Sequence, residues 1–141
     1  MVPCSTNSGV DDVTMSTYTL YSPPGSFRAF KSLITAEYNG TEVTVGSFDA
    51  AAVAAMSPSG KAPVLKVNDS EVIFESNAIC RFLARIKTDT GLYGNNAQES
   101  AIIDSWIDFS ANELELPATV WFYPAVGYMP FQKEAYVHQY Y

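Results

Sequence analysis

The side chains best suited to chemistry stand where the chain is predicted to pass from a strand into a helix. Ser26 is one of them, because it follows the apolar run 18–21 and the breaker Ser-Pro-Pro-Gly at 22–25. A hydroxyl at the start of a helix can donate a hydrogen bond to a bound thiolate, and the helix dipole also favours the anion. Serine is equally a frequent helix cap, and for Ser26 we favour this second interpretation.

Glu75 and Ser76 follow another strand in the same way. Ser76 is predicted to be the N-cap of a helix that runs to Ile86, after a strand over 72–74. The free N–H groups at a helix start can bind a carboxylate together with the serine hydroxyl, and Glu75 can bind the ammonium group beside it. The pair therefore fits the α-amino acid end of a ligand, although an ordinary helix cap explains the same residues equally well.

Pro63 begins the strand before this one, and a turn rich in Asn, Asp and Ser at 68–70 makes the two strands a hairpin. Because an X-Pro bond is the only peptide bond for which the cis form is cheap, we predict a cis bond between Ala62 and Pro63. The N–H and C=O groups of Ala62 would then be free to pair with an extended peptide ligand. In either case the proline would shape the fold.

Other kinds of chemistry find little support in the sequence. The loop at 22–26 has no cysteine, which excludes the disulfide exchange that a low-pKa thiolate at a helix start performs. Cys80 lies beside an apolar helical stripe and is predicted to be a packed core thiol. His138, the single histidine, has no Cys or Asp partner at a meaningful spacing. We therefore predict no metal site and no catalytic triad.

The composition limits the partners and the compartment. The 141 residues carry a net charge of −7, and so acidic a chain is a poor direct ligand for nucleic acid. No apolar run is long enough to span a membrane. Two cysteines, Cys4 and Cys80, make no disulfide framework, which indicates a reducing, cytoplasmic location. From residue 88 onward, acidic side chains outnumber the single Lys133; this surplus is either a solvated helix face, which we favour, or a docking face for a basic partner.

The order of the predicted elements places the candidate residues in one fold. A strand, a helix and a strand are followed by another helix, a hairpin and a closing helix, which is the βαβαββα order of a thioredoxin-like α/β domain. This domain is predicted over residues 15–87, after a disordered leader at 1–14. Its predicted strands are 18–21, 43–45, 63–65 and 72–74, and its helices are 26–38, 50–56 and 76–86.

The remainder of the chain is predicted to be helical. Residues 88–96 are predicted to be a linker, and 97–141 to be the truncated start of an all-α domain. An apolar stripe at helical spacing begins this part, and Pro117 is predicted to close its helix. Pro124 and Pro130 are then predicted to interrupt an aromatic tail.

Four segments of the chain resemble a known family. The runs Gly60-Lys61-Ala62-Pro63 and Glu75-Ser76-Asn77-Ala78-Ile79 are similar to runs that occur widely among glutathione transferases. The run Arg28-Ala29-Phe30-Lys31 and the Trp-x-x-Phe run at 106–109 point more narrowly to the gamma subunits of eukaryotic translation elongation factor 1. The resemblance covers roughly residues 17–130.

This resemblance implies a glutathione-transferase-like module that acts as a scaffold in translation and anchors the nucleotide-exchange subunit of the elongation factor complex. The alternative is a theta- or phi-like glutathione transferase that conjugates glutathione to electrophiles, with Ser26 as its catalytic residue. The resemblance implies no cofactor, and it makes glutathione a candidate ligand or substrate and a homodimer a candidate assembly. The residues that it assigns to glutathione binding are Lys61, Ala62, Pro63, Glu75 and Ser76.

Overall fold

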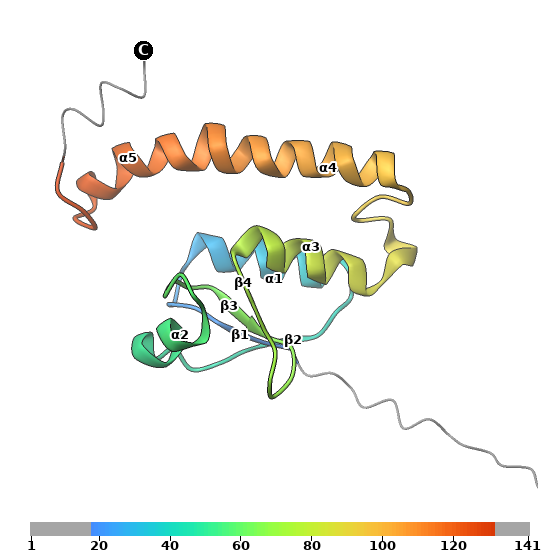
Figure 1. The fold of residues 1–141 in the computed structure, drawn as a ribbon, viewed down its shortest axis with the longest axis horizontal. Coiled ribbons are helices and arrows are strands. Elements are labelled where there is room, and N and C mark those ends of the chain that lie inside the picture. The colour runs from blue at the N-terminus through green and yellow to red at the C-terminus, as the bar shows by residue number, and fades with distance from the viewer. Residues whose placement is uncertain (1–17, 132–141) are drawn as a thin grey trace, which may run out of the picture.

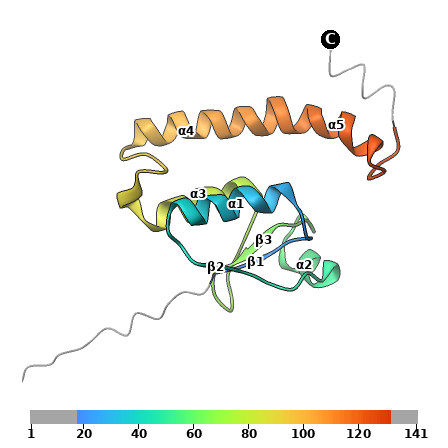
Figure 2. The same ribbon diagram turned by 180° about the vertical axis from the view of Figure 1, so that it is seen from behind.

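The computed structural model describes residues 18–131 (Figure 1). Its elements are β1 (Tyr18–Tyr21), α1 (Phe27–Tyr38), β2 (Val43–Val45), α2 (Ala50–Met56), β3 (Val64–Lys66), β4 (Val72–Phe74), α3 (Ser76–Ile86), α4 (Ala97–Phe109) and α5 (Leu116–Ala125). A four-stranded sheet carries α1 and α3 side by side, and α2 lies apart from these two helices in both views (Figures 1 and 2). A long helix that contains α4 and α5 lies beyond α1 and α3.

The sheet has the strand order β2-β1-β3-β4. β1 and β2 are parallel and are joined through α1, whereas β3 is antiparallel to both β1 and β4. Leu20 of β1 lies opposite Leu65 of β3, which in turn lies opposite Ile73 of β4. The element order and this mixed sheet confirm the predicted thioredoxin-like fold.

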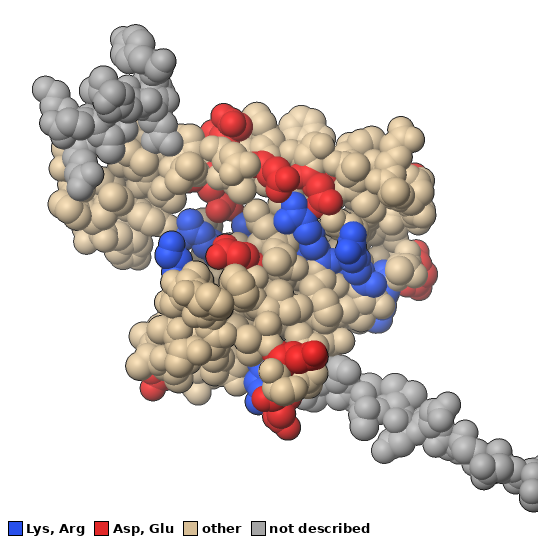
Figure 3. Space-filling view, viewed as in Figure 1, with Lys and Arg blue, Asp and Glu red and all other residues tan. Residues whose placement is uncertain are grey.

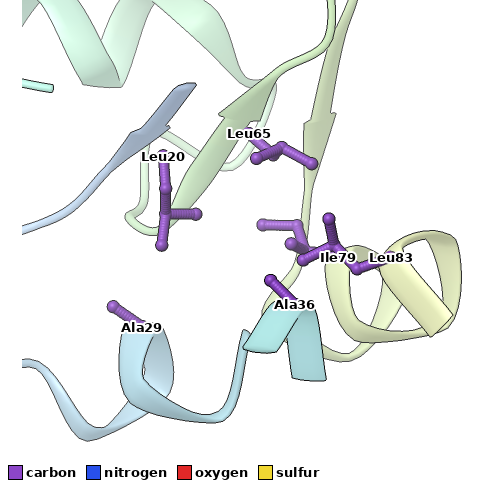
Figure 4. Close-up of a cluster of buried hydrophobic side chains, with 6 residues drawn as sticks. All are labelled: Leu20, Ala29, Ala36, Leu65, Ile79 and Leu83. Carbon is purple, nitrogen blue, oxygen red and sulfur yellow. The ribbon is translucent and has the colours of Figure 1, made fainter. Parts of the chain in front are cut away.

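The core lies between the sheet and the helices α1 and α3 (Figure 4). Its large side chains come from β1, β3 and α3, while α1 contributes alanines that let its backbone approach closely. Full burial of one leucine or isoleucine is worth about 1.5–3 kcal/mol. These contacts therefore fix where both helices start relative to the sheet. The cluster consists of Leu20, Ala29, Ala36, Leu65, Ile79 and Leu83.

A buried amide anchors the end of α1. Gly40 follows Asn39 with a φ of +58°, the left-handed conformation in which many helices end. The N–H group of Thr41 then returns to the carbonyl of Ala36 at 2.9 Å. The Asn39 side chain is 1% exposed, and its Nδ2 donates to the carbonyl of Leu83 at 2.7 Å. The C-terminal ends of α1 and α3 are therefore tied together.

The long helix differs from its prediction. α4 begins after Asn96, whose Oδ1 accepts a hydrogen bond from the N–H group of Glu99 at 3.0 Å. The helix does not end at Pro117, because π-helical turns at Ser110–Glu115 carry it on into α5. A proline lacks the N–H group and crowds the carbonyl four residues earlier, and the wider turns just before Pro117 accommodate this change of hydrogen bonding. Pro124 lies inside α5, but the helix ends one residue later at Ala125, and Pro130 lies beyond it.

The segment between the two parts has structure of its own. Residues 88–90 form a 3-10 helix, and Gly91 follows it with a φ of +63°. Tyr93 is 6% exposed, and the guanidinium carbon of Arg85 lies 4.3 Å from the centre of its ring. The segment therefore packs against the end of α3.

Some predictions fall on residues that the structure does not describe. These are the leader at 1–14, Cys4, His138 and the end of the helical part at 132–141. Among residues 18–131, none of the helices has the length and apolar character that crossing a membrane requires.

Candidate functional site

An open cleft of about 620 Å³ lies between the thioredoxin-like unit and the long helix. One wall is formed by the loop before β3 and by the start of α3, and the opposite wall by the π turns and α5. All five residues that were assigned to glutathione binding line this cleft. Lys61, Ala62, Pro63, Glu75 and Ser76 stand on the first wall, and Ala111, Glu115, Leu116, Thr119 and Tyr123 on the second.

The turn into β3 forms one part of the first wall. The Ala62–Pro63 bond is cis, as predicted. Pro63 is buried, and Ala62 lies just outside the ladder, because the register on both sides of β3 starts at Val64. Lys61 is exposed, and its carbonyl accepts a hydrogen bond from the hydroxyl of Ser57 at 3.5 Å. The backbone of Ala62 is thus placed at the cleft without a neighbouring strand.

The start of α3 forms the other part, and here one prediction is corrected. Glu75, rather than Ser76, is the N-cap residue, and Ser76 is the first residue of the helix. β4 reaches α3 through Glu75 alone, which turns the chain with a φ of +67°, a conformation that non-glycine residues rarely adopt. The first hydrogen bond of α3 runs from the N–H group of Ile79 to the carbonyl of Glu75, at 3.0 Å. The N–H groups of Ser76 and Asn77 precede this bond and therefore have no partner within the helix. Strained residues of this kind cluster at ligand sites.

Ser26 occupies the N-cap position of α1, as predicted, but its hydroxyl makes no capping hydrogen bond. Only its backbone takes part, because its carbonyl accepts a hydrogen bond from the N–H group of Phe30 at 3.1 Å. Pro23 and Arg28 line the cleft, whereas Ser26 between them does not. A role for Ser26 in activating a thiol therefore stays a prediction.

Polar side chains bridge the two walls of the cleft. Lys31 donates from Nζ to Glu115 Oε1 at 2.9 Å and to Asn77 Oδ1 at 2.6 Å. Arg28 donates from Nη1 to the hydroxyl of Tyr123 at 2.5 Å. None of these residues was predicted from the sequence to belong to the site. Arg28 and Lys31 are three residues apart, which places both on one face of α1, but the spacing alone does not show what that face contacts.

Arg81 of α3 makes a second bridge to the long helix. It donates from Nε to Asp104 at 2.5 Å and from Nη2 to Asp108 at 2.9 Å. The hydroxyl of Tyr93 lies 2.6 and 2.7 Å from the two carboxylate oxygens of Asp104. Hydrogen bonds from Tyr93 and Arg81 hold the pKa of Asp104 below its ordinary value. Part of the acidic surplus after residue 88 thus faces basic side chains of the same chain (Figure 3), so the preferred interpretation as a solvated face is corrected there.

Cys80 is half-buried, and its Sγ lies 3.6 Å from the hydroxyl oxygen of Ser32, which is fully buried. Within the described part of the chain, no group of three or more His, Cys, Asp or Glu side chains could hold a metal ion. The cleft instead offers backbone N–H groups, hydroxyls and charged side chains. These groups suit a polar ligand with an ammonium group and carboxylates.

Comparison with known proteins identifies relatives of the chain. Residues 16–85 match the family of the glutathione S-transferase N-terminal domain. The chain is 40% identical over 119 residues to elongation factor 1-gamma 1 of Oryza sativa subsp. japonica, in an alignment that covers 79% of this chain and 28% of the rice protein. The chain therefore spans less than a third of the length of this relative.

Solved structures agree with the fold. Glutathione transferase F2 from Populus trichocarpa has a TM-score of 0.71 at 21% identity, over 86% of this chain and 63% of that chain. The theta class glutathione S-transferase of Xanthomonas axonopodis pv. citri, solved with glutathione bound, has a TM-score of 0.64 at 30% identity, over 77% of this chain and 55% of that chain. The resemblance noted in the motifs is confirmed: the chain is a relative of the elongation factor 1-gamma proteins and carries a glutathione S-transferase N-terminal domain over residues 16–85.

Proposed function

We propose that the chain is an anchoring module of the elongation factor 1 complex, in which a glutathione transferase fold holds the nucleotide-exchange subunit. The observation that carries this proposal is the 40% identity to the rice elongation factor 1-gamma, compared with 21% and 30% to the two transferases. Exposed apolar side chains on α4, outside the cleft, support a protein-binding role, because Trp106 is 69% and Ile102 52% exposed.

Reconstitution with the purified nucleotide-exchange subunit tests the anchoring role. We expect the two proteins to elute together from a size-exclusion column, ahead of either protein alone. Glutathione should leave this complex intact, because the anchoring surface is proposed to be separate from the cleft. Separate elution of two folded proteins would contradict the proposal.

We further propose that the cleft binds glutathione. The N–H groups of Ser76 and Asn77 and the hydroxyl of Ser76 would donate to the carboxylate at the γ-glutamyl end of glutathione. The carboxylate of Glu75 would accept a hydrogen bond from the ammonium group at the same end. The backbone of Ala62 would pair with the middle of the peptide, and Lys61 would attract the second carboxylate. The gathering of these residues on one wall and the glutathione-bound theta class relative support this assignment.

A substitution at Ser76 tests the glutathione site. Ser76→Ala should weaken glutathione binding by about 1–2 kcal/mol, roughly 5- to 30-fold, because a hydrogen bond to a charged group is lost. Ser105→Ala is the control, since Ser105 is an exposed serine of α4 that does not line the cleft. Titration calorimetry with glutathione compares the three proteins. Equal affinity of the parent and Ser76→Ala would mean that this hydroxyl has no contact with the ligand.

Conjugation of glutathione to an electrophile is the second candidate function. It is favoured by one observation, which is that the hydroxyl of Ser26 is not engaged in capping α1. In that case Ser26→Ala should abolish conjugation of a generic electrophile while glutathione affinity stays nearly unchanged. In the anchoring function there is little conjugation to lose, and the parent and the variant behave alike in this assay.

A further inference from the structure

The long helix is attached to the rest of the chain by polar side chains. None of the described residues in α4, the π turns and α5 is buried, whereas Ile79 and Leu83 of α3 are fully buried. Ile102 and Trp106 of α4 remain 52% and 69% exposed. Within residues 18–131, an apolar core therefore does not determine the position of this helix.

A row of ion pairs joins the helix to α1 and α3 instead, and Figure 3 shows basic and acidic side chains facing each other along this line. At one end Arg81 holds two aspartates of α4, and at the other end two basic residues of α1 meet a glutamate of the π turns. We call this row the ion-pair seam. It consists of Arg28, Lys31, Arg81, Asp104, Asp108 and Glu115.

Glu115 differs from the two aspartates of the ion-pair seam because it also lines the cleft. Its partner Lys31 donates at the same time to Asn77, which follows Ser76 in the first turn of α3. A chain of two hydrogen bonds, 2.9 and 2.6 Å long, thus runs from the second wall of the cleft to the first. If the long helix shifts and Glu115 moves away from Lys31, the hydrogen bond from Lys31 to Asn77 changes as well.

We propose that Glu115 is a positioning residue, which fixes the separation of the two walls and the orientation of Asn77 at the start of α3. The side chains of Lys31 and Glu115 are each 29% exposed, and ion pairs in such surroundings are weak and are screened by salt. Loss of the charge at Glu115 therefore lets the cleft open, and so does high salt. The effect on ligand affinity rests on the proposed glutathione site, whereas the effect on wall separation does not.

Spin labels on the two walls measure their separation. The labels are attached to cysteines placed at Ser59, in the loop of the first wall, and at Ala118 of α5, which are both exposed, in a chain that carries Cys4→Ser and Cys80→Ala. We expect one narrow distance distribution at low salt. Raising salt from about 0.01 M to about 1 M shortens the screening length from about 30 Å to about 3 Å, and should broaden the distribution toward longer distances.

Matched variants identify the residue responsible. Glu115→Gln should broaden the distribution at low salt, and Lys31→Gln should do the same because it cuts the same bridge from α1. The control is Glu113→Gln, which removes an equal charge from an exposed position in the same π turns and should leave the distances unchanged. The double variant at residues 31 and 115 should behave like Glu115→Gln alone, since the ion pair that Lys31→Gln removes is one of the two that Glu115→Gln removes. Parental distances in Glu115→Gln and Lys31→Gln would overturn the proposal.

Glutathione affinity is measured on the same proteins without labels. We expect Glu115→Gln to weaken binding several-fold and Glu115→Asp, which keeps the charge, to recover part of the loss, while Glu113→Gln binds like the parent. If none of the proteins binds glutathione but the distances change as expected, the proposed ligand is wrong and the positioning role stands. If all bind glutathione equally and the distances do not change, the positioning role of Glu115 is wrong.

Discussion

Replacing Ser26 by alanine separates the two interpretations of this residue, and the structure determines the expected cost. A serine whose side chain caps a helix contributes about 1 kcal/mol to stability. Ser26 stands at the N-cap position of α1, but its hydroxyl makes no capping bond. Ser26→Ala should therefore lower the free energy of unfolding by less than about 0.5 kcal/mol, as is usual for a substitution that removes no specific contact.

Two other helices of the chain provide matched controls. The side chain of Asp49 caps α2 by accepting from the N–H group of Ala52 at 3.0 Å, and Asn96 caps α4 by accepting from Glu99 at 3.0 Å. Asp49→Ala and Asn96→Ala should each cost about 1 kcal/mol. Urea unfolding followed by far-UV circular dichroism measures all three variants, and a common slope allows their midpoints to be compared.

The comparison has a clear contrary outcome. If Ser26→Ala costs as much as the two controls, its hydroxyl caps α1 in solution, and it is not available to a ligand thiol. If its cost is small and conjugation nevertheless disappears at unchanged glutathione affinity, the hydroxyl acts on the thiolate and the chain is a transferase. The anchoring function predicts a small cost and no change in a conjugation rate that is already low.

Other substitutions test the backbone, the ion pairs and the buried amide. Glu75→Gly should unfold at a higher urea concentration than Glu75→Ala, because a φ of +67° strains any residue with a side chain but suits glycine. A higher urea midpoint for Glu75→Ala than for Glu75→Gly would contradict this. The pKa of Asp104 is lowered mainly by its hydrogen bond from Tyr93. The ionised carboxylate therefore contributes its full stabilisation of the folded state above the ordinary pKa of 3.8. This stabilisation is lost as the pH falls from 3.8 toward the lower pKa of Asp104 in the folded state. The stability difference between the parent and Asp104→Asn should accordingly shrink between neutral pH and pH of about 3 in urea titrations, and a constant difference would refute this. Asn39→Ala should cost about 1–3 kcal/mol, because the buried carbonyl of Leu83 loses its donor at 2.7 Å; thermal unfolding at the parental temperature would contradict it.

Local patterns in the sequence predict most of the thioredoxin-like unit. Apolar residues recur with helical spacing in α1 and α3, and turn residues separate the strands, so each element depends mainly on neighbours in the chain. The cis bond before Pro63 was predicted correctly for the same reason, since the proline itself makes the cis form accessible. Pro117 misled the prediction, because the π turns before it allow the helix to continue, and sequence periodicity does not reveal such turns.

The site was predictable only where its residues are neighbours in the sequence. Glu75 and Ser76 were placed together correctly, but which of them is the N-cap depends on how β4 meets α3 in space. The bridges through Lys31 were not predictable, because it lies 46 residues from Asn77 and 84 residues from Glu115. Such pairs arise from the packing of whole helices, and one sequence contains no direct signal of that packing.

Calorimetric titration of the purified nucleotide-exchange subunit into this chain tests the central claim most directly. The anchoring function predicts saturable binding that Ser26→Ala and Ser76→Ala leave unchanged, because neither residue is proposed to contact the partner. A folded chain that gives no binding signal, and that conjugates glutathione at ordinary transferase rates in a manner abolished by Ser26→Ala, would contradict the claim and assign the chain to catalysis.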